Sequence, residues 1–237
     1  RYPESEKIIA EIDKVIPQTA DLIGKKILIT AGGTREPIDP IRFIGNRSSG
    51  KQGFALAMAA ASRGAQVHLV IANSDLPNID GITTTAVETA EEMAAILNLE
   101  FPHCDALIMS AAVADAKVVN YSEGKIRKES LDKVELAKNP DILKSLAQIK
   151  RPGQIVVGFA AETMSSVDAL QKSGHEKLSS KNLDLIYVND VSHGAIFGQE
   201  KTKGIIIDNS NNVIKVPEIS KDTLADILLD QLVSKLG

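Results

Sequence analysis

The stretch ILITAGGTREPIDPIRFIGNRSSGKQG, residues 27–53, contains the transition that decides the fold. It begins with an apolar strand that runs directly into Gly32-Gly33-Thr34. A polar loop that carries arginines follows, and a second cluster of small residues, 46–50, opens a helix. Backbone amides at the head of a helix, beside small residues that let a ligand approach closely, form a site for phosphate. The stretch therefore predicts a strand, a loop and a helix that together bind a phosphate compound.

Strand and helix patterns alternate from residue 25 onward. The predicted strands are short and apolar, as expected of strands covered on both faces: Lys26–Thr30, Gln66–Ile71, Ile82–Ala86, Ala106–Ser110, Gln154–Phe159 and Leu183–Val188. Helical patterns lie between them at Gly50–Arg63, Thr89–Leu99, Pro140–Lys150 and Met164–Leu178. A turn signal between Gly204–Asp208 and Asn212–Val216 predicts a β-hairpin, and Ser220–Leu236 predicts a closing amphipathic helix.

This alternation predicts an α/β fold that is Rossmann-like and doubly wound. A mostly parallel sheet should carry helices on both faces, with a C-terminal β-hairpin region and a long flap loop in addition. Ligands bind at the carboxyl ends of such strands. Polar clusters at 32–46, 111–128, 160–163 and 189–198 each follow a strand, so we expect them to share one edge of the sheet. Residues 1–24 are predicted to be a helical leader or linker, and residues 25–237 one domain.

Composition excludes several classes of protein. A net charge of −4 argues against a nucleic-acid binder. No apolar run approaches the roughly 18–20 residues that span a bilayer, and no signal peptide opens the chain. The single cysteine, Cys104, excludes an internal disulfide framework, fits a cytoplasmic protein and lacks an evident activating partner. The four histidines show no ligand spacing, so a zinc site is not expected.

Two nucleotide-binding motifs match only in part. Gly45–Lys51 fits the start of a P-loop, but Gln52 replaces the serine or threonine that would hold magnesium. The dinucleotide fingerprint fails as well, because the glycines after the first strand are misplaced and residues 70–73 supply no acid for a ribose. What remains is anion binding by Ser48, Ser49 and Gly50 at the amino end of a helix.

Other polar residues allow two interpretations each. Asp115 follows residues small enough to admit a planar ring, and it either reaches a sugar or metal or caps a helix. The segment Lys117–Lys138 shows no clear periodicity, which fits a lid or a surface loop. Its run Lys125–Lys128 would neutralise a polyphosphate from a lid, or form a solvated face. Lys177 and Lys181 either share a helical face toward the site or are helix-terminal lysines favoured by the dipole.

Six ordered motifs across residues 25–235 resemble those of bacterial phosphopantothenate–cysteine ligases. They are GGTREPIDPIRFIGNRSSGKQGFALA, SAAVADAKV, GKIRK, LAKNPDIL, VVGFAAET and KNLDLIYVNDV. The resemblance implies a step of coenzyme A biosynthesis in which 4′-phosphopantothenate attacks the α-phosphate of CTP and pyrophosphate leaves. The amine of cysteine then attacks the acyl-cytidylate, which gives 4′-phosphopantothenoylcysteine and CMP. Positioning and charge neutralisation carry such chemistry, so no catalytic triad is expected.

The resemblance also implies roles for particular residues. Asn46 corresponds to the asparagine that contacts the carboxylate and is needed to turn over the acyl-cytidylate, and Lys125 begins a flap; both are expected to be catalytic. Arg42 and Ala112 are expected to hold phosphopantothenate together with Asn46. The expected CTP contacts are Ser48, Ser49, Gly50, Met109, Ser110, Ala111, Asp115, Lys125, Ala137, Lys138, Asn139, Pro140, Phe159, Lys177 and Lys181.

The same resemblance implies cofactors and partners. CTP is expected as co-substrate with Mg²⁺ on its triphosphate, the metal ligands being unassigned. A homodimer is expected, without a nucleic-acid or membrane partner. The leader is similar to the connector that joins this ligase to an N-terminal phosphopantothenoylcysteine decarboxylase, so FMN is expected only in that absent half. Two alternatives stay open: an NAD(P)-dependent oxidoreductase, and a non-catalytic nucleotide-binding subunit.

Overall fold

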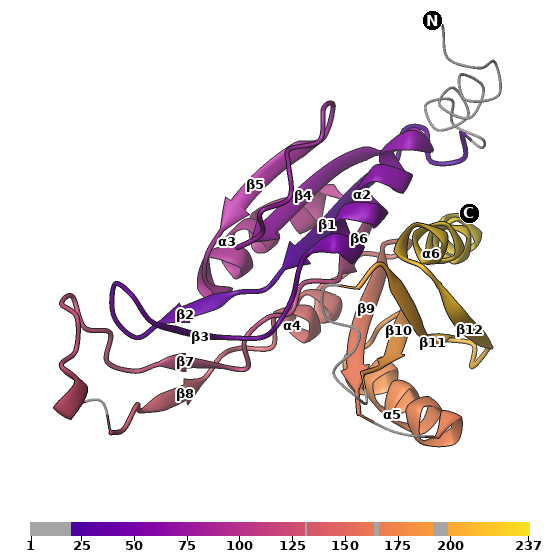
Figure 1. Cartoon of the computed structure of the whole chain (residues 1–237). Coiled ribbons are helices and arrows are strands. Elements are labelled where there is room, and N and C mark those ends of the chain that lie inside the picture. The colour runs from indigo at the N-terminus through magenta and orange to yellow at the C-terminus, as the bar shows by residue number, and fades with distance from the viewer. Residues whose placement is uncertain (1–19, 131, 164–165, 192–198) are drawn as a thin grey trace, which may run out of the picture.

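One large sheet forms the centre of the molecule. The computed structural model describes residues 20–130, 132–163, 166–191 and 199–237. Its eight-stranded sheet has the order β12-β11-β10-β9-β6-β1-β4-β5 (Figure 1). The strands from β10 to β5 in that order run parallel, and β11 and β12 add an antiparallel hairpin at one edge. The strand bounds are β1 Lys26–Gly32, β4 Gln66–Ala72, β5 Thr83–Val87, β6 Ala106–Met109, β9 Ile155–Glu162, β10 Leu185–Asp190, β11 Lys201–Asp208 and β12 Val213–Ser220.

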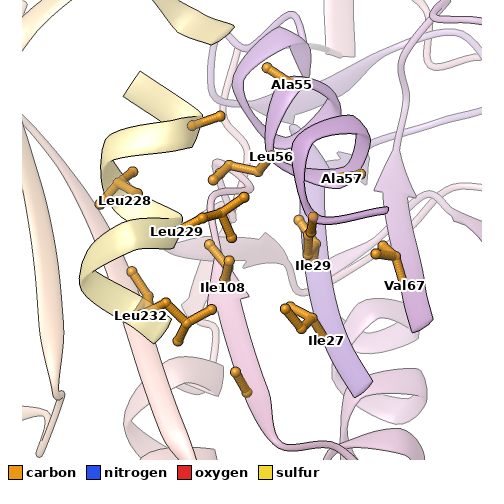
Figure 2. Packing of buried hydrophobic residues seen from close by; sticks show 14 of the residues in the cluster. Ile27, Ile29, Ala55, Leu56, Ala57, Val67, Ile108, Leu228, Leu229 and Leu232 are labelled. Atoms are coloured by element: carbon orange, nitrogen blue, oxygen red, sulfur yellow. The ribbon is translucent and has the colours of Figure 1, made fainter. Parts of the chain in front are cut away.

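Helices cover both faces of this sheet. On one face lie α2 (Lys51–Ser62) and α6 (Lys221–Leu236), and on the other lie α3 (Ala90–Glu100), α4 (Ile142–Gln148) and α5 (Val167–Ser180). Successive residues of β1 point to opposite faces, so Ile29 packs with α2 and α6 while Leu28 packs on the other side. Figure 2 shows Leu56 of α2 beside Leu229 of α6, above the sheet residue Ile108. The predicted doubly wound α/β fold and its C-terminal hairpin are confirmed.

Element ends differ from the prediction by a few residues, for local reasons. β9 extends beyond Phe159 to Glu162 because it continues to pair with β10, Glu162 lying beside Asp190. The helix predicted for 140–150 is shorter, since Asp141 caps it by accepting the Lys144 N–H at 3.0 Å. The helix predicted for 164–178 runs from 167 to 180 in the structure, and residues 164–165 lie outside the described part.

Two short antiparallel strand pairs form an arm that projects from the sheet (Figure 1). In this arm β2 (Arg35–Pro37) pairs with β3 (Phe43–Gly45), and β7 (Ala116–Val118) pairs with β8 (Leu136–Lys138). Neither pair was predicted: the segment 117–138, expected to be a lid or a surface loop, forms short strands at both its ends. Three-residue strands are too short to show a period of two, and only pairing with a distant segment creates them.

The predicted leader lies mostly outside the described residues. Its last residues, 21–24, form turns rather than a helix, and Leu22 is fully buried in the core cluster to which α2 and α6 contribute. Asp21 binds the guanidinium of Arg63 at 2.6 Å, and Arg63 also binds Asp230 of α6 at 2.8 Å. These contacts attach the end of the leader to the helical layer.

We expect Leu56→Ala to lower the free energy of unfolding by about 2–5 kcal/mol, because it leaves a cavity between α2, α6 and the sheet. Met58→Ala on the same helix is the matched control, since the Met58 side chain is 47% exposed. The control should lower this free energy by less than about 1 kcal/mol. Urea denaturation followed by circular dichroism measures both values, and equal losses would contradict the packing described above.

Candidate functional site

Two neighbouring cavities lie at the edge of the sheet where the parallel strands end. The α2 cavity is lined by residues 47–53 around the start of α2, by residues 110–112 after β6, by residues of β9, β10 and β11, and by Lys221 of α6. The α4–α5 cavity, of about 430 Å³, is lined by Asn46, Met109, residues 111–115 and 139–143, residues of β9 and the end of α5. This volume is within the range of small-molecule sites. Ala111, Ala112, Phe159 and Ala161 line both cavities and form their shared wall, so the two cavities are immediate neighbours.

Two glycines let α2 begin close to the strand ends. Gly50 precedes α2 with a φ of 75°, a conformation that favours glycine. A Cβ on Gly53 would lie 2.6 Å from both the Thr30 carbonyl oxygen and the Ser110 hydroxyl. No side chain caps the start of α2 at Gly50, and the N–H groups of a first helical turn have no acceptor within their own helix. Ser48, Ser49 and Gly50 line this cavity, where the N–H groups and the helix dipole favour an anion.

Asparagine side chains hold the wall of the α4–α5 cavity. The Asn46 side-chain amide donates to the Val113 carbonyl at 2.9 Å, and the Asn139 amide donates to the Ala114 carbonyl at 2.9 Å. The Asn139 backbone N–H donates to the Asp115 carbonyl, also at 2.9 Å. The Asp115 side chain is exposed at the rim and caps no helix, so the helix-cap interpretation is wrong. The predicted residues Met109, Ala111, Ala112, Asn139, Pro140 and Phe159 line the same cavity.

Two lysines at the end of α5 also line the α4–α5 cavity, and each is paired with a carboxylate. Lys177 binds Glu162, which also accepts the Ser173 hydroxyl at 2.7 Å, and Lys181 binds Asp141 at 2.8 Å. Burial raises the pKa of Glu162, but the contacts with Lys177 and Ser173 outweigh it, so this pKa lies below its usual range. Both lysines therefore share a face toward the site, and an anion there would compete with the two carboxylates.

Four predicted site residues belong to the arm and line neither cavity: Arg42, Lys125, Ala137 and Lys138. The Arg42 guanidinium lies 3.2 Å from the Asp39 carboxylate and donates to the Ile126 carbonyl at 3.2 Å. Lys125 is exposed. Lys138 nevertheless adjoins Asn139, which lines the α4–α5 cavity together with Asn46.

The sequence reasoning overlooked Asp39, which organises the arm. Its buried carboxylate accepts backbone N–H groups from Ile41 at 2.9 Å, Arg42 at 2.8 Å and Ile126 at 3.2 Å. Burial raises the pKa of Asp39, but these three hydrogen bonds and the Arg42 charge outweigh it, so this pKa lies below its ordinary value. Asp39 thereby joins the turn between β2 and β3 to the cationic run 125–128. The aspartate-proline pair at 39–40 is a turn signal that could have revealed it.

Other residues of the α2 cavity come from segments far apart in the sequence, where no motif connects them. Tyr187 lies edge-on to Phe159 with ring centres 5.6 Å apart, and its hydroxyl contacts that of Thr202 at 2.7 Å. Tyr187, Thr202 and Lys221 in this cavity, and Asp141 in its neighbour, were not predicted from the sequence. Within the described ranges, three or more acidic, histidine or cysteine side chains nowhere gather as a metal site. In the same part of the chain, no helix has the length and apolarity to cross a membrane.

Known proteins are similar in sequence to this chain over almost its whole length. The family model of the DNA/pantothenate metabolism flavoprotein C-terminal domain matches residues 22–236. The chain belongs to this family. The coenzyme A biosynthesis bifunctional protein CoaBC of Mycobacterium tuberculosis H37Rv is 37% identical over 251 residues, which cover 100% of this chain and 60% of the relative. CoaBC of Escherichia coli K12 is 39% identical over 226 residues, or 91% of this chain and 53% of that protein.

Solved structures of this family share the fold. The crystal structure of the C-terminal domain of a CoaBC protein superimposes with a TM-score of 0.77 at 34% identity, covering 92% of this chain and 98% of that one. A DNA/pantothenate metabolism flavoprotein from Streptococcus pneumoniae, 22% identical, has a TM-score of 0.75 over 89% of this chain and 99% of its own, and shows the fold alone. The chain spans about 60% of the length of the first curated relatives.

We expect Asp39→Ala to release the run 125–128 from the arm, because three N–H groups and Arg42 lose their shared acceptor. Limited trypsin digestion with mass spectrometry should then show cleavage after Lys125 and Arg127 about tenfold faster than in the parent protein. Asp80→Ala is the matched control, since Asp80 is an exposed loop aspartate, and it should digest like the parent. Unchanged cleavage in Asp39→Ala would show that Asp39 does not hold this segment.

Proposed function

We propose that this chain is a CTP-dependent phosphopantothenate–cysteine ligase. One observation carries the proposal. Asn46 lines a cavity with the residues at the end of β6, and the amino end of α2, which favours an anion, lies in the neighbouring cavity. Kinship with the bifunctional CoaBC proteins supports it. Because the chain spans about 60% of those relatives, we also propose that it forms their ligase half, fused in the full protein to a decarboxylase half that would hold FMN.

The two cavities suit the two parts of the nucleotide. In the proposal the triphosphate lies in the α2 cavity against Ser48, Ser49 and Gly50, and the nucleoside lies in the α4–α5 cavity against Asp115 and the α5 lysines. The α-phosphate then lies at the shared wall, beside Asn46. A carboxylate oxygen of phosphopantothenate attacks the α-phosphorus, and the bond to the bridging oxygen breaks as pyrophosphate leaves with its electron pair. Mg²⁺ would come with the triphosphate, whose oxygens are its preferred ligands, and would neutralise part of the charge.

Asn46 is assigned to the second step. The amine of cysteine attacks the acyl carbon of the acyl-cytidylate and loses a proton, the carbonyl oxygen gains negative charge, and CMP departs. A primary amide has two N–H donors and one acceptor oxygen, so its single contact with Val113 leaves capacity for an oxyanion and for the incoming amine. Donors held in place before the reaction stabilise such an oxyanion.

Pyrophosphate release tests the proposal directly. We expect release to require CTP, 4′-phosphopantothenate and Mg²⁺ together, and to be much slower with ATP, GTP or UTP. Addition of cysteine should then yield CMP and the amide product in equal amounts. Release with no nucleotide preference would refute the assignment to CTP, and no release at all would refute the ligase.

Asn46→Asp provides the second arm of this assay. We expect it to keep releasing pyrophosphate but to accumulate acyl-cytidylate, because the aspartate repels the developing oxyanion; mass spectrometry detects the intermediate. Asn78→Asp is the matched control, as Asn78 is exposed and lines neither cavity. Product formation at the parental rate in Asn46→Asp would remove Asn46 from the mechanism.

We further propose a two-fold homodimer with the arm at the partner subunit. The arm carries exposed large apolar side chains, a pattern typical of association surfaces: Ile41, Phe43, Val119, Tyr121 and Leu136. Arg42 and Lys125 lie on this arm and line neither cavity of their own chain. In a dimer they could instead reach the cavities of the partner subunit.

Sedimentation should therefore show a dimer that Ile41→Glu converts to monomer, because the variant places a charge in the apolar patch. Ile41 is 61% exposed, so the substitution should not unfold the chain. Leu99→Glu is the matched control, since Leu99 is 65% exposed and lies outside the arm on α3. A dimer that tolerates Ile41→Glu would place the interface elsewhere.

A further inference from the structure

The last helix of the chain contributes a lysine to the α2 cavity. Lys221 is the first residue of α6 and lines this cavity together with residues 47–53. Its carbonyl accepts the Gln52 side-chain amide at 3.1 Å, and its N–H donates to the Glu200 carbonyl at 3.0 Å. The backbone of Lys221 is thus held against the start of α2, more than 160 residues away in the sequence, and its side chain is half-buried.

The surroundings of Lys221 disfavour its positive charge as long as no ligand is bound. Lys51 is the first residue of α2, so both lysines lie at helix amino ends, where the dipole opposes positive charge. Burial lowers the pKa of Lys221, the Lys51 charge lowers it further, and Glu200 opposes the shift. Lys51 pairs with Glu200, whose side chain is 79% exposed. In the described part of the chain, no ion pair within 4 Å involves Lys221.

An anionic ligand in the α2 cavity would counter the effects that disfavour the positive charge of Lys221. It would lie at the amino end of α2, where the helix dipole favours negative charge, and would offset the repulsion between the two ammonium groups. The α-phosphate must reach the carboxylate at Asn46, which lines only the α4–α5 cavity. The part of a nucleotide that enters the α2 cavity is therefore the end of its phosphate chain.

We propose that Lys221 binds the β- and γ-phosphates of the nucleotide and holds the pyrophosphate as it leaves. This inference rests on the proposed function, because only transfer to the α-phosphate makes pyrophosphate the leaving group. Negative charge grows on the bridging oxygen as its bond to the α-phosphorus breaks. A cation already held in a partly desolvated cavity stabilises that charge without reorganisation.

Calorimetric titrations of CTP, CMP and inorganic pyrophosphate into Lys221→Met test the proposal. Methionine keeps much of the side-chain length and removes the charge. We expect the dissociation constants for CTP and pyrophosphate to rise about tenfold to a hundredfold, as for loss of one charge-assisted hydrogen bond. The constant for CMP should stay within about twofold, because CMP lacks both distal phosphates. Lys221→Arg should recover most of the affinity.

Lys215→Met is the matched control, because it removes the same charge from an exposed position on β12 that lines neither cavity. It should bind all three probes as the parent does. The proposal is overturned if Lys221→Met binds pyrophosphate as tightly as Lys215→Met, if it loses CMP to the same degree as CTP, or if the parent binds no pyrophosphate. The pyrophosphate titration needs no turnover. It therefore tests the role of Lys221 in phosphate binding even if the pyrophosphate-release assay shows that the chain is not a ligase. Circular dichroism of each variant confirms that the fold is kept.

Discussion

The burial of β1 on both faces is the constraint on which the rest of the structure depends. Ile29 and Leu28 are fully buried toward opposite helical layers, so helices must cover both faces of the sheet, and most connections between its parallel strands carry one. Such crossovers have one hand and return every strand in the same direction. All carboxyl ends of the parallel strands then lie at one edge. The two cavities follow from this geometry, since loops from distant segments must meet where the strands end.

The site combines anion-binding devices of two kinds. The α2 cavity offers backbone N–H groups and a helix dipole, made accessible because Gly53 lets α2 approach β1 and β6. The α4–α5 cavity offers lysines that already hold carboxylates, such as Lys177 with Glu162. At the second cavity a ligand must take these lysines from the carboxylates that they already bind. This difference suits the proposed nucleotide, whose phosphate chain would enter the α2 cavity while the α4–α5 cavity would bind its nucleoside.

Hydrogen bonds to buried carboxylates, Asp39 and Glu36, rather than an apolar core hold the arm. Asp39 joins the turn between β2 and β3 to the cationic run 125–128, and Arg42 reinforces it through the Ile126 carbonyl. Few apolar groups are buried there, and several large ones remain exposed. An element held by hydrogen bonds and rich in exposed apolar surface is poorly stabilised alone and gains most from a second subunit.

The sequence by itself determined the alternation of strands and helices, the doubly wound class and the strand-end position of Asn46, Ser48 and Asp115. These features are local, because hydrophobic period and helix-end residues act within a few positions of one another. Only the tertiary structure decided the strand pairs of the arm, the carboxylate partners of Lys177 and Lys181, and the presence of Lys221 in the α2 cavity. Each of these joins segments that are far apart along the chain or too short to show a period. Their contacts exist only once the sheet has ordered its strands, so no local pattern encodes them.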